Sequence, residues 1–147
     1  MAGEAILREV QLTLPMAPDM EIAASKTATA MAELMSMSPD KIDEVRMAVV
    51  EACINAIEHS RAPDRKVALT FEVLGNAAAE PQVLRITVRD GGIGFTPNQV
   101  EEPSIEEKLT AARKRGWGLK IIRGLMDQVE IDSGATGTSI VMTKALG

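Results

Sequence analysis

The sequence predicts an α+β fold, a two-layer α/β sandwich in which helices cover one face of a mixed, mostly antiparallel sheet. Two observations carry this prediction. Several segments combine β-forming residues with an alternation of apolar and polar side chains, and they come in pairs joined by short loops. Other segments repeat apolar residues at the helical spacing, and the order of strands and helices along the chain is typical of two layers.

The first two elements are predicted from breakers and caps. Residues 4–14 alternate roughly between apolar and polar side chains, and Pro15 ends this strand. A helix is expected over Met20–Met37, which is rich in good helix formers. Ser38 can cap the next helix and Pro39 can occupy its first position, so the chain changes direction there.

The second helix, about Pro39–His59, has the best apolar pattern in the chain. Its predicted buried stripe, with the residues that widen it, is Ile42, Val45, Val49, Val50, Cys53, Ile54, Ala56 and Ile57. Two β-rich segments follow, 66–74 and 82–90. The loop 75–81 joins them, which predicts a hairpin.

The last third of the chain combines a long loop with a short helix and a closing hairpin. Residues 91–115 are rich in glycine and charge, and a loop of this length in a compact domain is typically a binding lid or disordered. A helix is expected over 119–129. The strands 129–133 and 138–144 are expected to pair with each other.

Composition limits the classes of function. Hydrophobic residues make up 46% and charged residues 25%, so a packed soluble domain is expected, with 1–147 as a single unit. The net charge of −5 and the three aromatic residues argue against direct binding of nucleic acid. Neither a signal peptide nor a membrane-spanning run is recognisable, so a cytoplasmic protein with no membrane association is expected.

The sulfur-containing residues have two possible uses. Cys53 is the only cysteine and falls within an apolar helical pattern, which favours core packing over reactivity. Met31, Met35 and Met37 could pack in the core or form an adaptable partner surface, and core packing is the preferred interpretation.

Three short motifs carry candidate chemistry. Glu51 and Asn55 lie one helical turn apart, about 40° in projection, and their oxygens are ligands that suit magnesium. A helix-surface pair with no task is the simpler alternative. The segment 90–95, DGGIGF, follows a strand; Asp90 could accept a hydrogen bond from an exocyclic amino group such as that of adenine, although Asp-Gly is also an ordinary turn.

The third motif is a basic, glycine-containing segment before a helix. Residues 113–119, RKRGWGL, place cations and free backbone N–H groups where an anion is favoured. A solvated basic loop is the alternative. A Walker P-loop is not recognisable and neither glycine segment completes GxGxxG, which disfavours those two kinds of nucleotide site.

The motifs together resemble a known family. ExxxN on a helix, DGGIG after a strand, GWGL at a helix start and a late GTS occur in the order of the N, G1, G2 and G3 boxes of the GHKL superfamily. The resemblance covers roughly Ser38–Lys144. It implies the histidine-kinase-type ATPase (Bergerat) fold, with ATP and Mg²⁺ bound within 44–140 under an ATP lid at about 95–118.

The resemblance also implies roles for single residues. Glu51 would be the general base, Asn55 would hold magnesium and Asp90 would hold adenine. The remaining nucleotide contacts would come from Gly92, Ile93 and Gly94 at the adenine pocket, from Arg115, Gly116, Trp117, Gly118 and Leu119 at the phosphates, and from Thr138 at the base or its water. Trp117 and Gly92 depart from the usual boxes.

Within this superfamily the chain is similar to the anti-sigma-factor serine/threonine kinases. The only histidine, His59, falls at the end of the nucleotide helix, which argues against a phosphoacceptor histidine. Such kinases bind a sigma factor or, alternatively, phosphorylate an antagonist of the STAS fold, and the resemblance implies a homodimer. The alternatives are an ATP-binding switch that transfers no phosphate and a pure protein-binding module.

Overall fold

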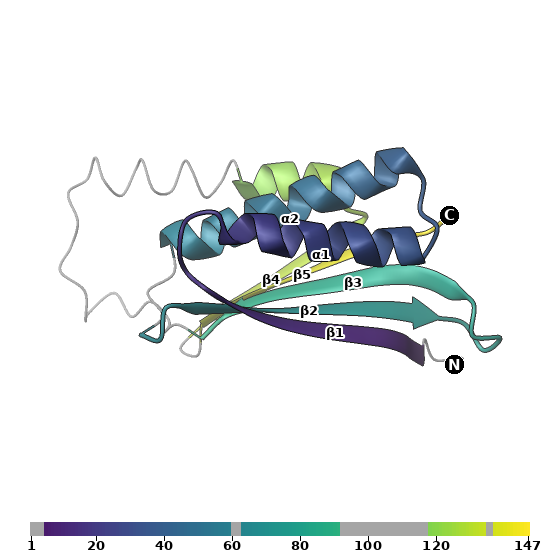
Figure 1. Cartoon of the computed structure of the whole chain (residues 1–147), viewed down its shortest axis with the longest axis horizontal. Helices are drawn as coiled ribbons and strands as arrows, with labels where there is room; N and C mark the ends of the chain where they lie inside the picture. Colours follow the sequence, from purple (N-terminus) through teal and green to yellow (C-terminus); the bar gives the residue numbers. More distant parts are fainter. Residues whose placement is uncertain (1–4, 60–62, 92–117, 135–136) are drawn as a thin grey trace.

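The computed structural model describes residues 5–59, 63–91, 118–134 and 137–147. In chain order it contains β1 (Ala5–Pro15), α1 (Met20–Leu34), α2 (Pro39–His59), β2 (Lys66–Gly75), β3 (Pro81–Asp90), β4 (Gln128–Gly134) and β5 (Gly137–Ala145). Residues 118–125 are also helical. The two labelled helices and the segment 118–125 lie together on one face of the sheet (Figure 1). The predicted α/β sandwich is therefore confirmed.

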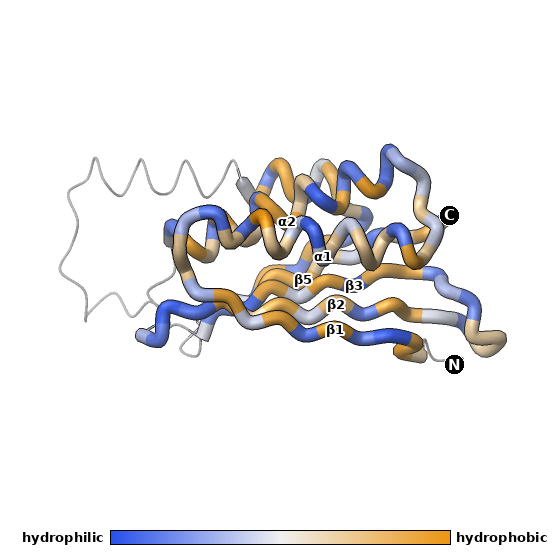
Figure 2. The backbone as a smooth tube through the Cα atoms, viewed as in Figure 1, coloured by the Kyte–Doolittle hydropathy of each residue, from blue (hydrophilic) through white to orange (hydrophobic). Residues whose placement is uncertain are grey.

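Within the described residues, the sheet has five strands in the order β1-β2-β3-β5-β4, and every pairing among them is antiparallel. Hydrophobic and hydrophilic residues alternate along the strands (Figure 2). Because side chains of a strand alternate between its two faces, the apolar positions of neighbouring strands fall into rows under the helices. One such row runs through Phe71, Ile86 and Met142, which are opposite one another in the register.

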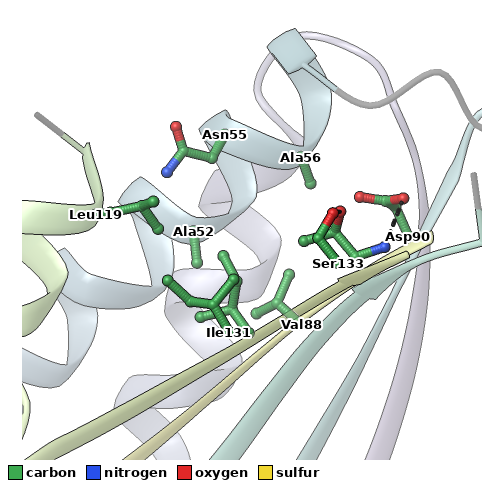
Figure 3. Close-up of a pocket in the computed structure, with 10 residues that line it drawn as sticks. Ala52, Asn55, Ala56, Val88, Asp90, Leu119, Ile131 and Ser133 are labelled. Carbon is green, nitrogen blue, oxygen red and sulfur yellow. Dashed lines mark hydrogen bonds between the residues drawn. The ribbon is translucent and has the colours of Figure 1, made fainter. Parts of the chain in front are cut away.

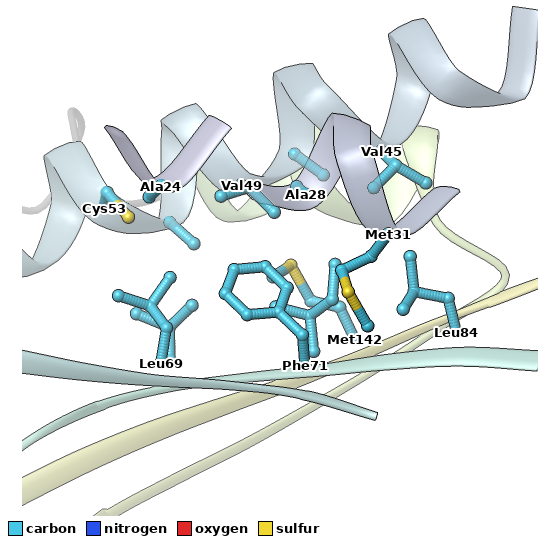
Figure 4. Packing of buried hydrophobic residues seen from close by; sticks show 14 of the residues in the cluster. Ala24, Ala28, Met31, Val45, Val49, Cys53, Leu69, Phe71, Leu84 and Met142 are labelled. Atoms are coloured by element: carbon cyan, nitrogen blue, oxygen red, sulfur yellow. The ribbon is translucent and has the colours of Figure 1, made fainter. Parts of the chain in front are cut away.

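The core lies between this sheet and the helices (Figure 4). Leu69 and Phe71 of β2 are fully buried, as are Val45 and Val49 of α2. Met31, Met35 and Met37 are also buried, so the structure places all three methionines in the core rather than on a surface. The two-layer packing holds the strand ends and the helices in fixed positions around the site.

The first helix is shorter than predicted. It ends at Leu34, because Ser36 adopts φ 61° and the chain then turns towards the core. Its buried face consists of Ala24, Ser25, Ala28, Met31 and Ala32, whereas Ile22 is 49% exposed. Small side chains at this spacing allow the helix to approach its neighbours closely.

The second helix begins as predicted. The hydroxyl of Ser38 accepts a hydrogen bond from the backbone N–H of Lys41 at 3.3 Å, and Pro39 is the first helical residue. Val45, Val49, Cys53 and Ala56 of the predicted stripe are buried, and the other four of its residues are half-buried.

The last helix is shorter than predicted. It ends at residue 125 rather than 129, because the strand pairing of β4 with β5 begins at Gln128. Asp127 also bonds to β5: its backbone N–H donates to Thr143, and its carboxylate accepts from the backbone of Ala145 at 2.6 Å. Among the described helices, none has the length and apolar content required to cross a membrane.

Candidate functional site

A pocket opens between α2, the start of the segment 118–125 and the ends of three strands (Figure 3). Its volume is about 510 Å³, counting the space at its open mouth. The lining residues are Ala52, Asn55, Ala56, Val88, Asp90, Leu119, Ile131, Ser133, Thr138 and Ile140. Four residues predicted from the motifs, Asn55, Asp90, Leu119 and Thr138, therefore lie around one pocket.

The walls of the pocket are apolar. On one side, Ala52 and Ala56 stand one turn apart on α2, and their small side chains leave space beside the helix. On the other side, Val88 comes from β3, and Ile131 and Ile140 face each other across β4 and β5. Such walls suit a flat, apolar ring system whose edges carry the polar groups.

Sequence reasoning missed these wall residues. The available signals were two alanines four residues apart on the same helix as Asn55, and the pairing of the last hairpin. The sequence could place Ala52 and Ala56 on one side of α2. It could not show that this side faces open space, because the same pattern occurs where a helix packs closely on a sheet.

One end of the pocket carries a carboxylate and two hydroxyl groups. Asp90 is the last residue of β3, is only 8% exposed, and lies opposite Thr138 in the register of β5. The backbone N–H of Thr138 donates to Oδ1 of Asp90 at 3.4 Å. The hydroxyl groups of Thr138 and Ser133 are 3.0 Å apart and share a hydrogen bond. A ligand at this end meets both a hydrogen-bond acceptor and hydroxyl groups.

The other end carries an amide with an unused donor. Nδ2 of Asn55 is buried and has no hydrogen-bond partner among the described residues. Gly118 lies against this amide, because a Cβ added to Gly118 would be 2.8 Å from Nδ2 and 3.0 Å from Oδ1. Buried polar groups in proteins are normally hydrogen-bonded, so an unpartnered amide indicates a position that a ligand completes.

Glu51 lies on the same side of α2 as Asn55, but it does not line the pocket. Its side chain is half-buried and makes no hydrogen bond or ion pair with the other described residues. The carboxylate therefore has free acceptor capacity beside the site. The structure thus places Asn55 at the pocket and Glu51 one turn away from it along the helix.

Several predicted residues lie outside the described part of the chain. They are Gly92, Ile93, Gly94, Arg115, Gly116 and Trp117, together with the predicted lid except for Gly118. The side chain of His59 is likewise not described. Within the described residues, the site is thus built from the three strands β3, β4 and β5, from α2 and from residues 118 and 119.

The chemistry of the donors fits a magnesium ion better than a metal held entirely by protein. The described residues include no group of three or more His, Cys, Asp or Glu side chains that could hold a metal ion. Magnesium keeps several waters and takes only one or two protein ligands together with substrate phosphates. The amide oxygen Oδ1 of Asn55, which lies beside Gly118, is an atom that suits such a minimal site, whereas the unpartnered Nδ2 can only donate a hydrogen bond.

Cys53 lies on the core side of α2. Burial raises the pKa of its thiol to about 12, and the nearby negative charge of Glu21 contributes in the same direction. A thiol that remains protonated is a poor nucleophile. The structure thus supports the interpretation of Cys53 as a packing residue.

Comparison with known proteins identifies the family. The model of the histidine kinase-like ATPase domain matches residues 14–144. The chain belongs to this family. The match includes every residue that lines the pocket of this histidine kinase-like ATPase domain.

Individual relatives agree with the family. The chain is 31% identical over 143 residues to the serine-protein kinase RsbW of Bacillus licheniformis, covering 93% of this chain and 85% of that protein. It is 27% identical to the serine-protein kinase RsbW of Bacillus thuringiensis (strain Al Hakam), covering 92% and 84%.

A solved structure agrees in fold. The crystal structure of the RsbU and RsbW domains of Rv1364c from Mycobacterium tuberculosis matches with a TM-score of 0.68 and 19% identity. The match covers 95% of this chain and 32% of that longer one, and it shows that the two share a fold.

Proposed function

We propose that this protein is an ATP-dependent serine/threonine protein kinase that acts as an anti-sigma factor. It binds ATP with Mg²⁺, phosphorylates an anti-sigma antagonist of the STAS fold, and alternatively sequesters a sigma factor. The similar proteins named serine-protein kinase RsbW support this activity. The observation that carries the proposal is the pocket in which Asn55, Asp90 and Thr138 converge.

Adenine is recognised at the end of the pocket that Asp90 and Thr138 form. The Asp90 carboxylate accepts a hydrogen bond from the exocyclic amino group of the base, and the hydroxyl of Thr138 contacts the base or its water. Gly92, Ile93 and Gly94 belong to this part of the site by their place in the motif. The apolar walls from Val88 and Ala56 enclose the ring and exclude water.

The phosphates bind at the other end of the pocket, where Asn55 of α2 lies beside Gly118. Asn55 would hold the magnesium ion, which would neutralise charge on the phosphate oxygens. The backbone at Gly118 and Leu119 holds the phosphates at the start of the segment 118–125. Arg115, Gly116 and Trp117 complete this part of the site by their place in the motif.

Glu51 serves as the general base. Its carboxylate, free of partners among the described residues, orients the incoming serine or threonine hydroxyl and accepts its proton. Phosphoryl transfer passes through a loose transition state, so positioning and charge stabilisation contribute most of the rate. The proposal also includes a homodimer and a cytoplasmic location, with no direct nucleic-acid or membrane binding.

The variant Glu51→Gln tests the role of the base. We expect ATP affinity in the presence of Mg²⁺ to stay within about twofold of wild type, while transfer to the antagonist falls at least about 100-fold. Nucleotide titration and a phosphate-transfer assay measure the two effects. Glu33→Gln, at an exposed position of α1, is the matched control and should retain both. An equally active Glu51→Gln enzyme removes Glu51 from the mechanism.

The same assays separate the alternatives. Wild-type protein that binds ATP but transfers no phosphate to any candidate antagonist is a regulatory switch rather than a kinase. Absence of magnesium-dependent ATP binding leaves the protein-binding module.

A further inference from the structure

Lys144 is a buried lysine that lies away from the pocket. It is on β5, is only 5% exposed, and its ammonium group contacts three other parts of the chain. Nζ donates hydrogen bonds to the backbone oxygen of Leu125 and, at 3.2 Å, to Oε2 of Glu44. It lies 4.0 Å from Oδ1 of Asp127. Lys144 therefore joins β5 to α2 and to the last turn of the segment 118–125.

The partners of Lys144 place it at one end of a helix pair. Glu44 and Asn55 are 11 residues apart on α2, which corresponds to about 20° in projection and about 16 Å along the axis. Both side chains thus stand on one face of α2. Gly118 lies against Asn55, and Leu125 is tied through Lys144 to Glu44. The segment 118–125 therefore runs antiparallel along this face of α2, with one point of attachment near each of its ends.

Apolar packing alone does not determine the position of the segment along α2. Ile122 and Met126 are buried and fix which side of the segment faces the core. Apolar contacts are non-directional, whereas a hydrogen bond has a defined distance and angle. The bond from Lys144 to Leu125 therefore adds a directional restraint at the end of the segment, beside the two hydrogen bonds that hold Asp127 to β5.

The charge of the buried Lys144 ammonium group is not explained by packing alone. Burying a charge is costly unless it is paired and hydrogen-bonded, and an apolar side chain of similar volume often serves packing equally well. Lys41 offers a comparison, because its Nζ donates to the backbone oxygens of Ala145 and Leu146 near the end of the chain. Lys41 therefore fastens the same end of β5 by hydrogen bonds to residues outside the segment 118–125.

We propose that Lys144 is a positioning residue for the phosphate end of the nucleotide site. By holding Leu125, it keeps the first residue of the segment, Gly118, against Asn55. The Asp90 end of the pocket does not depend on this contact, because paired strands build it. This inference rests on the proposed binding of ATP.

The variant Lys144→Met tests the proposal by a ratio of two affinities. Calorimetric titration of the full chain with ATP and Mg²⁺ and, separately, with adenosine measures both. We expect the affinity for ATP to fall about tenfold, the size of one charged hydrogen bond, while that for adenosine stays within about twofold. Lys41→Met is the matched control, and its ratio of the two affinities should equal that of wild type.

A general loss of folded structure would lower the affinities for ATP and adenosine together. The ratio of the two affinities therefore distinguishes a positioning role of Lys144 from a role in stability. Equal losses for ATP and adenosine, or no loss for either, overturn the proposal. If Lys144→Met fails to fold, as thermal unfolding would show, Glu44→Gln decides instead. We expect this variant to lower the affinity for ATP about threefold and to leave the affinity for adenosine unchanged. An unchanged ratio of the two affinities overturns the proposal. If the wild-type protein binds no ATP, the proposed function is wrong. This outcome is distinct from a changed or unchanged ratio in the Lys144 variant.

Discussion

The two ends of the pocket are built differently. At one end, Asp90 and Thr138 come from neighbouring antiparallel strands, and their polar groups already bond to each other. At the other end, Asn55 of α2 meets Gly118 of a second helical segment, and the amide nitrogen of Asn55 has no partner among the described residues. Strand register therefore holds the polar groups of the proposed base site in place, whereas the helix pair leaves a donor that no described residue uses.

This difference separates two contributions to ATP binding. Groups already held by the strands lose little freedom when a base enters, and preorganisation of this kind favours affinity. An unpartnered buried amide carries a cost in the free protein, and binding relieves that cost. Variants at the strand end should therefore affect every adenine ligand, and variants at the helix end should affect only ligands with phosphates.

The largest effect is expected for Asp90→Ala. Loss of the buried acceptor should weaken ATP and adenosine alike by about 100-fold, because the exocyclic amino group then enters the pocket without a partner. Titration with both ligands measures the effect. Asp132→Ala, at an exposed position of β4, is the matched control and should bind normally. If only the affinity for ATP fell, Asp90 would contact the phosphates rather than the base, and the roles of the two ends of the pocket would be exchanged.

Asn55→Ala should have a smaller effect that is selective. We expect ATP affinity with Mg²⁺ to fall about tenfold and the adenosine affinity to remain unchanged. The free protein should become no less stable, or gain about 1 kcal/mol, because the variant removes an unsatisfied buried group. Chemical denaturation with and without ATP measures both quantities. A variant that is destabilised by several kcal/mol would show that the amide is a structural group.

Gly118→Ala should also weaken ATP binding selectively, with a smaller loss of affinity than Asn55→Ala. The added Cβ would displace the Asn55 amide, so we expect ATP to bind about fivefold more weakly while adenosine binds normally. Gly124→Ala lies in the same helical segment with nothing near the added atom, and it serves as the control. That control should stabilise the protein by up to about 1 kcal/mol, as alanine does in helices, and leave both affinities unchanged. Equal behaviour of the two variants would separate Gly118 from the site.

The smallest effect concerns Cys53, which belongs to neither end of the pocket. Its pKa is raised from 9.0 to about 12 in the folded protein, so the unfolded chain loses the thiol proton first as pH rises. The resulting stability is present below pH 9 and is lost progressively towards pH 12. At pH 9.5 the loss should be about 0.8 kcal/mol relative to Cys53→Ala, whose pH dependence lacks this contribution. Identical pH slopes for the two proteins between pH 8 and 10 would contradict the shift.

Several features were predictable because they are local. The Ser38-Pro39 start of α2 depends on a hydroxyl and a fixed backbone angle within one turn of the helix. The strands were recognisable from alternation, and the order of the four motifs resembled one family before any fold was known. In each case, residues near one another in the chain carry the information.

Other features depended on contacts between distant parts of the chain. The sequence could not show that α1 buries its alanines and exposes Leu34 by 60%, because helical periodicity does not tell which face meets a sheet. It also could not predict the early end of the last helix, which the pairing of β4 with β5 decides.

By itself, the sequence determined the type and order of the elements and the residues with chemical potential, since hydrogen bonding and periodicity within short segments specify them. Only the tertiary structure decided which of these residues face one cavity, that Nδ2 of Asn55 has no partner among the described residues, and that Lys144 ties three elements together. The physical reason is that these properties depend on packing between segments up to 100 residues apart, which no local pattern encodes.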